Sequence, residues 1–196
     1  MAASYDRRWP RYVADTTRET LARVGPGVPS ALLDIACGTG TLLEEIAKRL
    51  PEAGGRIAGV DLSTGMLGKA RRKLPRQAIV VAADATRLPF RAAAFEVAVS
   101  VSALHHWRDP GMVLREARRV LRPGGRLVIT DWCGDRWVER IRAALHRRHD
   151  HAHLRVYRSS ELAALMTDAG FREVHVERWR SGWQWSLMTA TASAPP

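Results

Sequence analysis

Short apolar runs of strand length alternate along this chain with amphipathic helical patterns, and this alternation is what most constrains its fold. Five such runs occur, and most of them are rich in Val, Ile or Leu: Ala31–Ala36, Arg56–Val60, Ala78–Ala83, Phe95–Val99 and Arg126–Thr130. A strand that is apolar on both faces has to be covered on both faces. The pattern therefore predicts an α/β fold in which helices flank a doubly wound, mostly parallel sheet.

The helical patterns carry start and stop signals of their own. Ser63 is the expected N-cap of the helix that follows the second run. Asp109 is the expected cap of a later helix, with Pro110 at its first position and Pro123-Gly124-Gly125 as its stop. A further helix is expected from Tyr12 to Val24, before the first strand.

The regular alternation of short apolar runs and helical patterns ends after Thr130. Helices are expected over about Asp135–Arg147 and Ser160–Ala169. Two extended segments follow, Phe171–Trp179 and Trp183–Thr191, and the short connection between them makes them an antiparallel pair. The expected sheet therefore has seven strands, five parallel ones and a C-terminal hairpin.

Length and composition set the class of protein. The chain has 196 residues, which fits a single domain, with residues 1–28 expected as a helical cap over the active site. No apolar run approaches the ~18 residues of a membrane span, and the start lacks an apolar signal region, so we expect a cytoplasmic protein. Lys+Arg 31 against Asp+Glu 20 gives a formal charge of +11, but the arginines are scattered through nearly every segment. Nucleic acid is therefore an unlikely partner.

A glycine turn joins the first strand to the helix after it, and ligands of doubly wound sheets bind at such a turn. Gly38 and Gly40 are present, but the third glycine of a dinucleotide site is replaced by Leu43. A phosphate-binding P-loop is excluded too, because no Lys-Ser/Thr pair follows at the required distance. A ligand with a ribose but no pyrophosphate fits better.

Two acidic residues follow the next two strands. Asp61 ends the second strand about 20 residues after the glycine turn, where a carboxylate can accept both ribose hydroxyls. Asp84 stands just after the third strand, where a carboxylate can accept from an exocyclic amino group. The sequence thus offers one carboxylate for a ribose and one for an adenine.

Seven motifs between about Tyr5 and Thr191 together carry a family resemblance: Leu33–Gly40, Val60–Ser63, Ala83–Ala85, Leu88–Phe90, Phe95–Val99, His105–Trp107 and Leu121–Leu127. The chain resembles the class I S-adenosylmethionine-dependent methyltransferases, and within them the small enzymes related to ubiquinone and menaquinone C-methyltransferases. The resemblance implies S-adenosyl-L-methionine as the cofactor. One departure is Ala36, where many members carry glycine.

The resemblance also implies a set of cofactor contacts. Asp34 is expected near the methionine amino group, although it could instead cap or bridge loops at the sheet end. The other implied contacts are the backbone of Gly38 and Gly40, Asp61 to ribose, Leu62 and Met66 against adenine, Asp84 and Ala85 at the adenine edge, and Ser100 with Val101 near the methionine moiety. Cys37 is expected to be a small packing residue, because methyl transfer needs no nucleophile from the enzyme.

The acceptor pocket is expected beyond the fourth and fifth strands, under the N-terminal segment. Its expected wall is apolar and aromatic, which suits a flat or lipophilic acceptor: Trp9, Tyr12, Trp107, Trp132, His153 and Tyr157. The alternative is that Trp107 and Trp132 merely cap the sheet.

His105 or His106 is the candidate general base, because imidazole titrates near neutrality and the pair follows the fourth strand. A histidine there can also be a structural hydrogen-bonding group, and Asp131 is the next candidate. His146, His149, Asp150, His151 and His153 form a second cluster, which is interpreted as a helix end and polar loop with no metal bound.

The sequence thus predicts an enzyme that transfers a methyl group to a small, partly apolar or aromatic acceptor. The acceptor, the atom that is methylated and the oligomeric state stay open. Two alternatives remain: an RNA methyltransferase with an arginine-rich face, and a cofactor-binding protein with this fold that transfers no methyl group.

Overall fold

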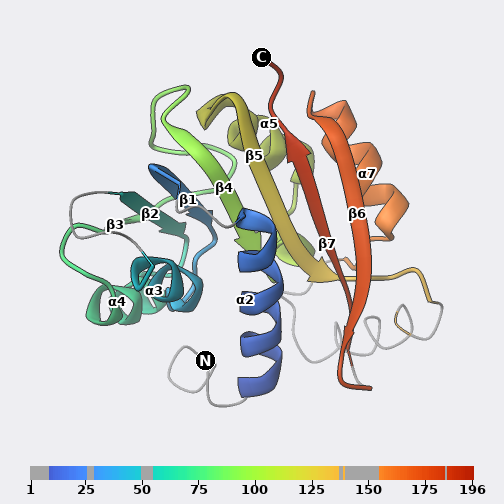
Figure 1. Ribbon diagram of the computed structural model, residues 1–196, viewed down its shortest axis with the longest axis horizontal. Coiled ribbons are helices and arrows are strands. Elements are labelled where there is room, and N and C mark those ends of the chain that lie inside the picture. The colour runs from blue at the N-terminus through green and yellow to red at the C-terminus, as the bar shows by residue number, and fades with distance from the viewer. Residues whose placement is uncertain (1–8, 26–28, 50–54, 137–138, 140–154, 184) are drawn as a thin grey trace.

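One seven-stranded sheet forms the centre of the protein, with strand order β3-β2-β1-β4-β5-β7-β6 (Figure 1). The structure is a computed structural model that describes residues 9–25, 29–49, 55–136, 139, 155–183 and 185–196. The strands are β1 (Ala31–Ile35), β2 (Arg56–Asp61), β3 (Ile79–Ala82), β4 (Phe95–Val101), β5 (Leu121–Trp132), β6 (Arg172–Ser181) and β7 (Trp185–Ser193). Strands β1 to β5 pair in parallel, and β7 pairs antiparallel with both β5 and β6. The expected doubly wound sheet with a terminal hairpin is confirmed.

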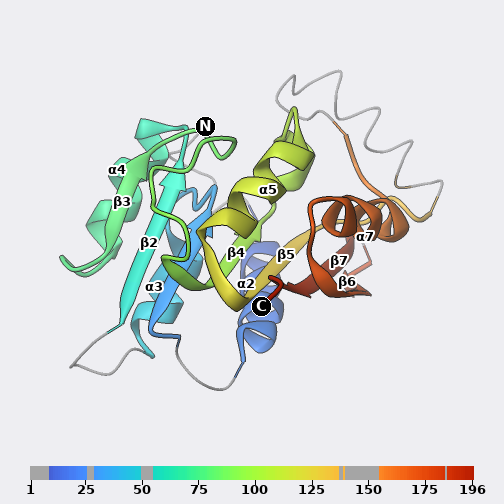
Figure 2. The same ribbon diagram turned by 90° about the horizontal axis from the view of Figure 1, so that it is seen from above.

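Helices cover both faces of this sheet, and each face has its own hydrophobic core. The helical elements are α2 (Pro10–Val24), α3 (Thr41–Ala47), α4 (Thr64–Lys73), the short 3-10 helix η2 (Leu104–His106), α5 (Pro110–Val120) and α7 (Ser159–Asp168). Side chains of α5 and α7 pack on one face, and side chains of α2, α3 and α4 pack on the other. Figure 2 shows α5 and α7 on the side of the sheet opposite to α2 and α3.

The expected helix caps form as the sequence indicates. The Ser63 hydroxyl accepts a hydrogen bond from the Met66 backbone N–H at 3.3 Å, at the start of α4. The Asp109 carboxylate accepts from the Met112 N–H at 2.8 Å, and Pro110 is the first residue of α5. Each cap satisfies one of the backbone donors that a helix start leaves without an internal partner.

Several strand boundaries differ from the expectation, most clearly at the start of β5 and at the terminal hairpin. Strand β5 begins at Leu121, directly after α5, because Leu121 pairs with Phe95 before an irregularity in the register of β4 and β5. The terminal hairpin turns two residues later than expected, with β6 ending at Ser181 and β7 beginning at Trp185. Gly182 lies at this turn with φ +62°, a backbone conformation that suits glycine.

A chain of buried hydroxyl groups ties α2 to the sheet. The hydroxyls of Thr20 on α2 and Thr130 on β5 lie 2.7 Å apart, and Thr130 lies 3.1 Å from the hydroxyl of Thr189 on β7. The indole N–H of Trp179 on β6 donates to Thr189 at 3.0 Å. We call Thr20, Thr130 and Thr189 the threonine chain. It fixes α2 against the C-terminal half of the sheet, across β5 (Figure 1).

Two expectations concern parts of the chain that the structure does not describe in full. Most of the expected helix 135–147 and the residues before Trp9 lie outside the described residues. Among the described helices, none is both long and apolar enough to cross a bilayer.

Candidate active site

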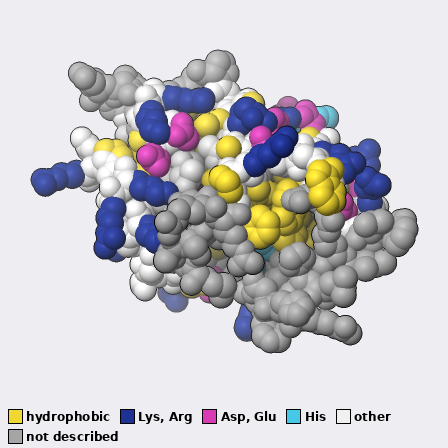
Figure 3. Space-filling view, turned by 90° about the horizontal axis from the view of Figure 1, so that it is seen from below, with side chains coloured by type: hydrophobic (Ala, Val, Ile, Leu, Met, Phe, Trp, Pro, Cys, Tyr) yellow, Lys and Arg dark blue, Asp and Glu magenta, His cyan; other side chains and the backbone are white. Residues whose placement is uncertain are grey.

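The carboxyl ends of the parallel strands meet at the lower edge of the sheet in Figure 1, and the candidate site residues gather there. This is the edge at which open α/β sheets bind ligands. Seen from below, hydrophobic side chains line a hollow at this end of the molecule, and Lys and Arg side chains lie around part of it (Figure 3). The edge has two parts: the ends of β1, β2 and β3, and the ends of β4 and β5.

The glycine turn after β1 is shaped by two different constraints. Gly40 has φ +77°, and a Cβ atom added to it would lie 2.9 Å from the Cβ of Ala70 on α4. Glycine is therefore required for α4 to pack against this turn. Gly38 has φ +53°, and a Cβ added there would meet no atom of the described residues within 4 Å. The space beside Gly38 is open to a ligand.

The residue that replaces the third glycine has a packing role. Leu43 is fully buried in the core beneath α3. It faces Gly59 on β2, where an added Cβ would lie 2.7 Å from both Leu43 Cδ1 and Cys37 Sγ. The close approach of helix and strand is thus provided by a glycine on the strand instead of the helix. Burial raises the pKa of the Cys37 thiol well above its usual range, which fits its expected role as a packing residue.

Asp61 is held in place at the end of β2 by two backbone donors. Its Oδ2 accepts from the Gly38 N–H at 2.8 Å, and its Oδ1 accepts from the Ser63 N–H at 2.8 Å. The carboxylate therefore lies between the glycine turn and the start of α4. Next to it, Leu62 has 72% of its surface exposed, and Met66 is partly buried in the first turn of α4.

Asp84 is exposed after β3, and its Oδ1 accepts from both the backbone N–H and the hydroxyl of Thr86 at 2.8 Å. These hydrogen bonds lower the pKa of Asp84, with the backbone donor contributing most. The neighbouring Ala85 is partly buried. The expected adenine-edge residues thus follow β3 on the same edge of the sheet as Asp61.

Asp34 is buried at the end of β1, with 2% of its surface exposed. Within the described part of the chain, its Oδ1 has no hydrogen-bond partner. Burial, and secondly the negative charge of Asp61, raise the pKa of Asp34 well above its ordinary value. A buried carboxylate oxygen without a partner is costly, and an N–H donor or a cation on a ligand would relieve that cost.

Three further backbone and side-chain features border the turn. Ala36 has φ +62°, so this alanine adopts the left-handed conformation that the more usual glycine would adopt without strain. The Ser100 hydroxyl on β4 donates to the Ile35 carbonyl at 2.8 Å and is buried, so it ties β4 to the end of β1. Val101 is partly buried beside it.

His105 and Asp131 form a buried pair at the ends of β4 and β5. The His105 Nδ1 lies 2.7 Å from Asp131 Oδ1, and the two side chains are 6% and 1% exposed. Burial alone would raise the pKa of Asp131, but the charge and hydrogen bond of His105, together with the Trp132 N–H, hold it below its ordinary value. The sequence proposed these residues as alternative bases, and the structure joins them in one unit.

The two adjacent histidines differ in how far they are exposed. His105 is buried, whereas His106 is exposed, and their rings lie 4.0 Å apart. The Trp132 ring stacks on His105 at 4.8 Å with an angle of 16° between the planes. His105 is therefore fixed by a carboxylate on one side of its ring and by an indole over its face.

An aromatic cluster adjoins this pair through Trp132, and we define it as Trp9, Tyr12, Trp132 and Trp185. Trp185 lies 5.4 Å from Trp9, 5.2 Å from Tyr12 and 5.0 Å from Trp132, measured between ring centroids. Three of these residues were predicted as pocket residues, and the sequence analysis missed Trp185. Its place follows from the insertion of β7 beside β5, and the residues of the hairpin do not indicate which strand the hairpin joins.

A second residue missed by the sequence analysis connects the aromatic cluster to β4. The indole N–H of Trp132 donates to the Tyr12 hydroxyl at 2.8 Å, and that hydroxyl lies 2.6 Å from Ser102 Oγ. Ser102 follows β4 with φ +55°, a strained conformation for serine that often occurs at functional sites. No sequence signal marks this strain.

Other predicted residues lie elsewhere. Trp107 and Tyr157 are 8% and 7% exposed and belong to the hydrophobic core on the α5 and α7 face, so neither is part of the aromatic cluster. For Trp107 this matches the alternative that it caps the sheet. His153 and most of the second histidine cluster, residues 146–153, lie outside the described residues. The described residues contain no group of three or more side chains arranged to hold a metal ion.

The chain is similar in sequence to known methyltransferases. Residues 33–129 match the family model described as a methyltransferase domain. The demethylmenaquinone methyltransferase of Beutenbergia cavernae is 34% identical over 138 residues, which are 70% of this chain and 52% of that protein. The malonyl-[acyl-carrier protein] O-methyltransferase of Geobacter sulfurreducens is 36% identical over 158 residues, 76% of this chain and 58% of that protein. The chain thus spans about half the length of the curated relatives it matches.

The fold is also shared with solved structures. A SAM-dependent methyltransferase from Thermotoga maritima superposes with a TM-score of 0.79 at 20% identity, covering 97% of this chain and 94% of that one. The matched domain thus agrees with the sheet order. It also agrees with the glycine turn and with the carboxylate at the end of β2. The chain belongs to the class I S-adenosylmethionine-dependent methyltransferases and is similar to their menaquinone-type group.

Proposed function

We propose that this protein transfers a methyl group from S-adenosyl-L-methionine to a small acceptor that is at least partly apolar or aromatic. The observation that carries the proposal is the arrangement of the lower edge of the sheet. A glycine turn with two carboxylates lies at the ends of β1 and β2, and an aromatic cluster that contacts a buried His–Asp pair through Trp132 lies at the ends of β4 and β5.

The residues at the ends of β1, β2 and β3 fit the cofactor. Asp61 is fixed by two backbone donors beside the open space at Gly38, where it could accept ribose hydroxyls. Exposed Leu62 and partly buried Met66 offer apolar surface for adenine, with Asp84 and Ala85 following β3. The unpartnered Oδ1 of Asp34 suits a positively charged amino group.

The chemistry divides between cofactor and protein. When bound, the cofactor supplies a methyl group on a sulfonium, a strong electrophile. The protein has to align the acceptor in line with that methyl group, exclude water and remove a proton where the acceptor is neutral. The first two tasks suit the aromatic cluster.

His105 is the group we propose for the proton. Its Nδ1 is bonded to the Asp131 carboxylate, so Nδ1 carries a proton and Nε2 is the basic nitrogen. Asp131 orients the ring and stabilises the imidazolium that forms, a division of labour known from other His–Asp pairs. Asp131 is then a positioning residue, and the exposed His106 is the less suited of the two histidines.

Tyr12 and Ser102 are proposed to position the acceptor. Because an indole N–H can only donate, the Tyr12 oxygen accepts from Trp132, and the hydroxyls of Tyr12 and Ser102 share a second hydrogen bond. Trp185 packs against the Tyr12 ring and Trp9 packs against Trp185, so a flat acceptor with one polar group matches this wall.

Calorimetric titration tests the cofactor part of the proposal. We expect binding of S-adenosylhomocysteine and no binding of NAD, because Leu43 fills the place of the third glycine. Tight NAD binding without a response to S-adenosylhomocysteine would contradict the proposal. Methyl transfer to a panel of small aromatic and lipophilic acceptors then separates an enzyme from a cofactor-binding protein without transfer. Submicromolar RNA binding with a steep salt dependence would favour the RNA methyltransferase alternative.

A further inference from the structure

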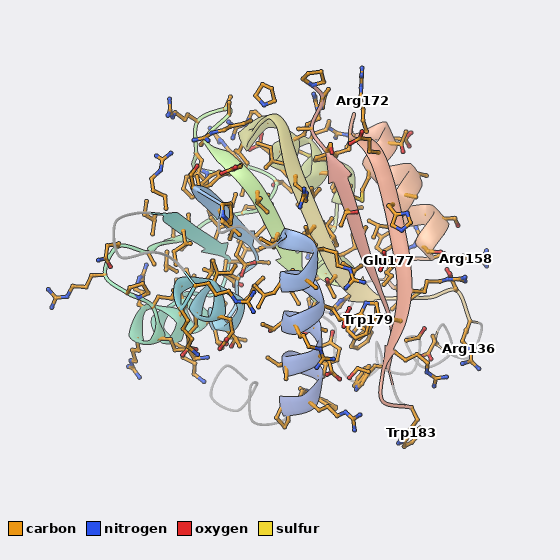
Figure 4. The ribbon with its side chains drawn as sticks, viewed as in Figure 1. Arg136, Arg158, Arg172, Glu177, Trp179 and Trp183 are labelled. Atoms are coloured by element: carbon orange, nitrogen blue, oxygen red, sulfur yellow. The ribbon has the colours of Figure 1, made fainter. Side chains whose placement is uncertain are left out.

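The turn between β6 and β7 projects beyond the lower edge of the sheet, next to the first turn of α2. We define the hairpin tip as Arg180, Gly182 and Trp183 of this turn together with Arg11 of α2. The tip is held to the helix because the Ser181 hydroxyl donates to Asp15 at 2.7 Å. A Cβ added to Gly182 would lie 4.0 Å from the Arg11 guanidinium carbon. Figure 4 shows Trp183 at the lower end of β6 and Arg172 at its upper end.

Trp183 is the most exposed large hydrophobic side chain of the described residues, with 74% of its surface accessible. Exposure of a single apolar residue is common, but an exposed tryptophan has a ring with both an apolar body and a polar N–H. Such rings are favoured where a protein meets the boundary between lipid and water. The side chain is carried by a hairpin that is fixed at its base, so its position is defined by the fold.

The cations of the tip are poorly neutralised. The Arg11 side chain is 81% exposed and lies 3.8 Å from Asp15, a long distance for an ion pair. The Arg180 guanidinium donates to the Trp183 backbone carbonyl at 2.7 Å, a neutral acceptor that does not offset the charge of an arginine. Asp15 itself is 15% exposed and already engages Arg18 at 2.9 Å and Ser181. The exposed charge of the tip is therefore positive.

The tip also borders the proposed acceptor site. Trp185 follows Trp183 by two residues and contacts Trp9, Tyr12 and Trp132 of the aromatic cluster. Seen from below, apolar surface and basic side chains lie together at this end of the molecule (Figure 3).

We propose that the hairpin tip docks the protein onto an anionic phospholipid bilayer, with Trp183 at the interface and Arg11 and Arg180 against lipid phosphates. Tryptophan at the interface and basic side chains against an anionic surface are the two contributions that together hold a peripheral protein on a membrane. The docking would bring the lower edge of the sheet to the lipid, and a lipophilic acceptor could then reach the aromatic cluster without crossing water. This last step rests on the proposed function, whereas the docking itself does not.

Co-sedimentation with lipid vesicles tests the docking. At physiological ionic strength the protein is expected to bind vesicles of phosphatidylcholine that contain phosphatidylglycerol, and to bind vesicles of phosphatidylcholine alone much more weakly. Trp183→Ala is expected to weaken binding roughly tenfold. Replacing Arg11 or Arg180 by Gln is expected to weaken it about fivefold each, the scale of one basic residue at an anionic surface.

Two variants serve as matched controls. Met112→Ala removes an exposed hydrophobic side chain from α5, and Arg172→Gln removes an arginine from the far end of β6. Both are expected to bind vesicles as the parent protein does. All variants should keep the melting temperature and the affinity for S-adenosylhomocysteine, so a variant that fails to fold is recognised.

Several outcomes would overturn the docking proposal. One is an equal loss in tip variants and control variants, which would mean that net charge alone attracts the protein. Another is failure of the parent protein to bind the anionic vesicles. A third is binding of RNA that depends on the tip while vesicle binding does not. A protein that binds vesicles but not S-adenosylhomocysteine would keep the docking and refute the proposed function instead.

Discussion

Two buried carboxylates stand at the same edge of the sheet, and they differ in how their charge is balanced. Asp131, at the end of β5, is bonded to His105 and to the Trp132 N–H, and its pKa is lowered. Asp34, at the end of β1, is equally buried but faces the negative charge of Asp61, and its pKa is raised. Each carboxylate has one oxygen without a hydrogen-bond partner among the described residues, Oδ1 of Asp34 and Oδ2 of Asp131. What distinguishes them is the neighbouring group, which is an imidazole for Asp131 and a second carboxylate for Asp34.

The difference separates the two halves of the site by what they need from a ligand. In the half built on β4 and β5, the protein itself supplies hydrogen-bond partners to Asp131, namely the His105 ring and the Trp132 N–H. In the half built on β1 and β2, Asp34 lies near a second carboxylate, Asp61, and its Oδ1 has no partner among the described residues, which favours a ligand that brings a positive charge. Under the proposed function, cofactor affinity should depend on the half at β1 and β2, and turnover should depend on the half at β4 and β5.

The largest effect is expected for His105→Asn. If His105 accepts the acceptor's proton, its removal should lower turnover by ~10²–10⁴ and leave the cofactor dissociation constant nearly unchanged. Turnover with a responsive acceptor and calorimetry with S-adenosylhomocysteine measure the two quantities. The matched control is His106→Asn, which changes the neighbouring exposed imidazole. Wild-type turnover in both variants would place the base elsewhere or mean that the acceptor arrives ionised.

The next effect concerns stability, and it should have opposite signs for the two carboxylates. Asp131→Ala breaks a buried pair and is expected to lower the free energy of unfolding by roughly 3–5 kcal/mol. Asp34→Asn removes a buried charge and is expected to raise it in the absence of ligand. Chemical denaturation of each variant beside the parent protein gives both values.

The two carboxylates should also differ in how their contribution to stability depends on pH. The pKa of Asp131 is lower in the folded than in the unfolded protein, so its stabilisation is present above the unfolded value, about 3.9, and is lost as the pH falls through the folded value. The pKa of Asp34 is raised, so its contribution becomes less favourable as the pH rises from about 3.9 through the folded value. The loss of unfolding free energy caused by Asp131→Ala should therefore become smaller at acidic pH. The increase in unfolding free energy caused by Asp34→Asn should become larger as the pH rises. Parallel curves for the two variants would refute the contrast.

The smallest of these effects is expected for Asp61→Ala, in the cofactor half alone. Losing hydrogen bonds to a charged group should weaken cofactor binding by ~1.5–3 kcal/mol. Asp109→Ala is the matched control, because Asp109 also accepts a backbone N–H at a helix start but caps α5, which packs with α7 on the other face of the sheet. Calorimetry should show a loss of affinity for Asp61→Ala only. An equal loss in both variants would point to general destabilisation.

The cofactor half could be predicted from the sequence to a large extent. Its residues follow single strands, and the chain order Gly38, Asp61, Asp84 is enough to place them at one edge once a parallel sheet is recognised. The caps at Ser63 and Asp109 are local features too, because each side chain bonds a backbone group three residues away. Local signals and a repeating β–α pattern suffice for this part.

The acceptor half could be predicted only in part. His105 and Asp131 were both candidates, but their pairing depends on the register of β4 and β5 and joins residues 26 positions apart. Trp185 reaches the cluster because β7 inserts between β5 and β6, which sequence periodicity does not encode. The strain at Ser102 is imposed by its surroundings, because its N–H donates to the Thr130 carbonyl and its hydroxyl meets Tyr12.

The threonine chain also bears on the order in which the protein is assembled. It links Thr20 to Thr130 and Thr130 to Thr189, contacts that span 110 and 59 residues. The Ser181–Asp15 bond spans 166 residues. Long loops close late in folding, and chains are made from the N-terminus, so α2 acquires its last anchors only after β7 has left the ribosome. The contacts from the glycine turn to Asp61 span 23 residues and are available far earlier. A nascent chain of this protein can therefore form the half proposed to bind the cofactor long before it contains all of the half proposed to bind the acceptor.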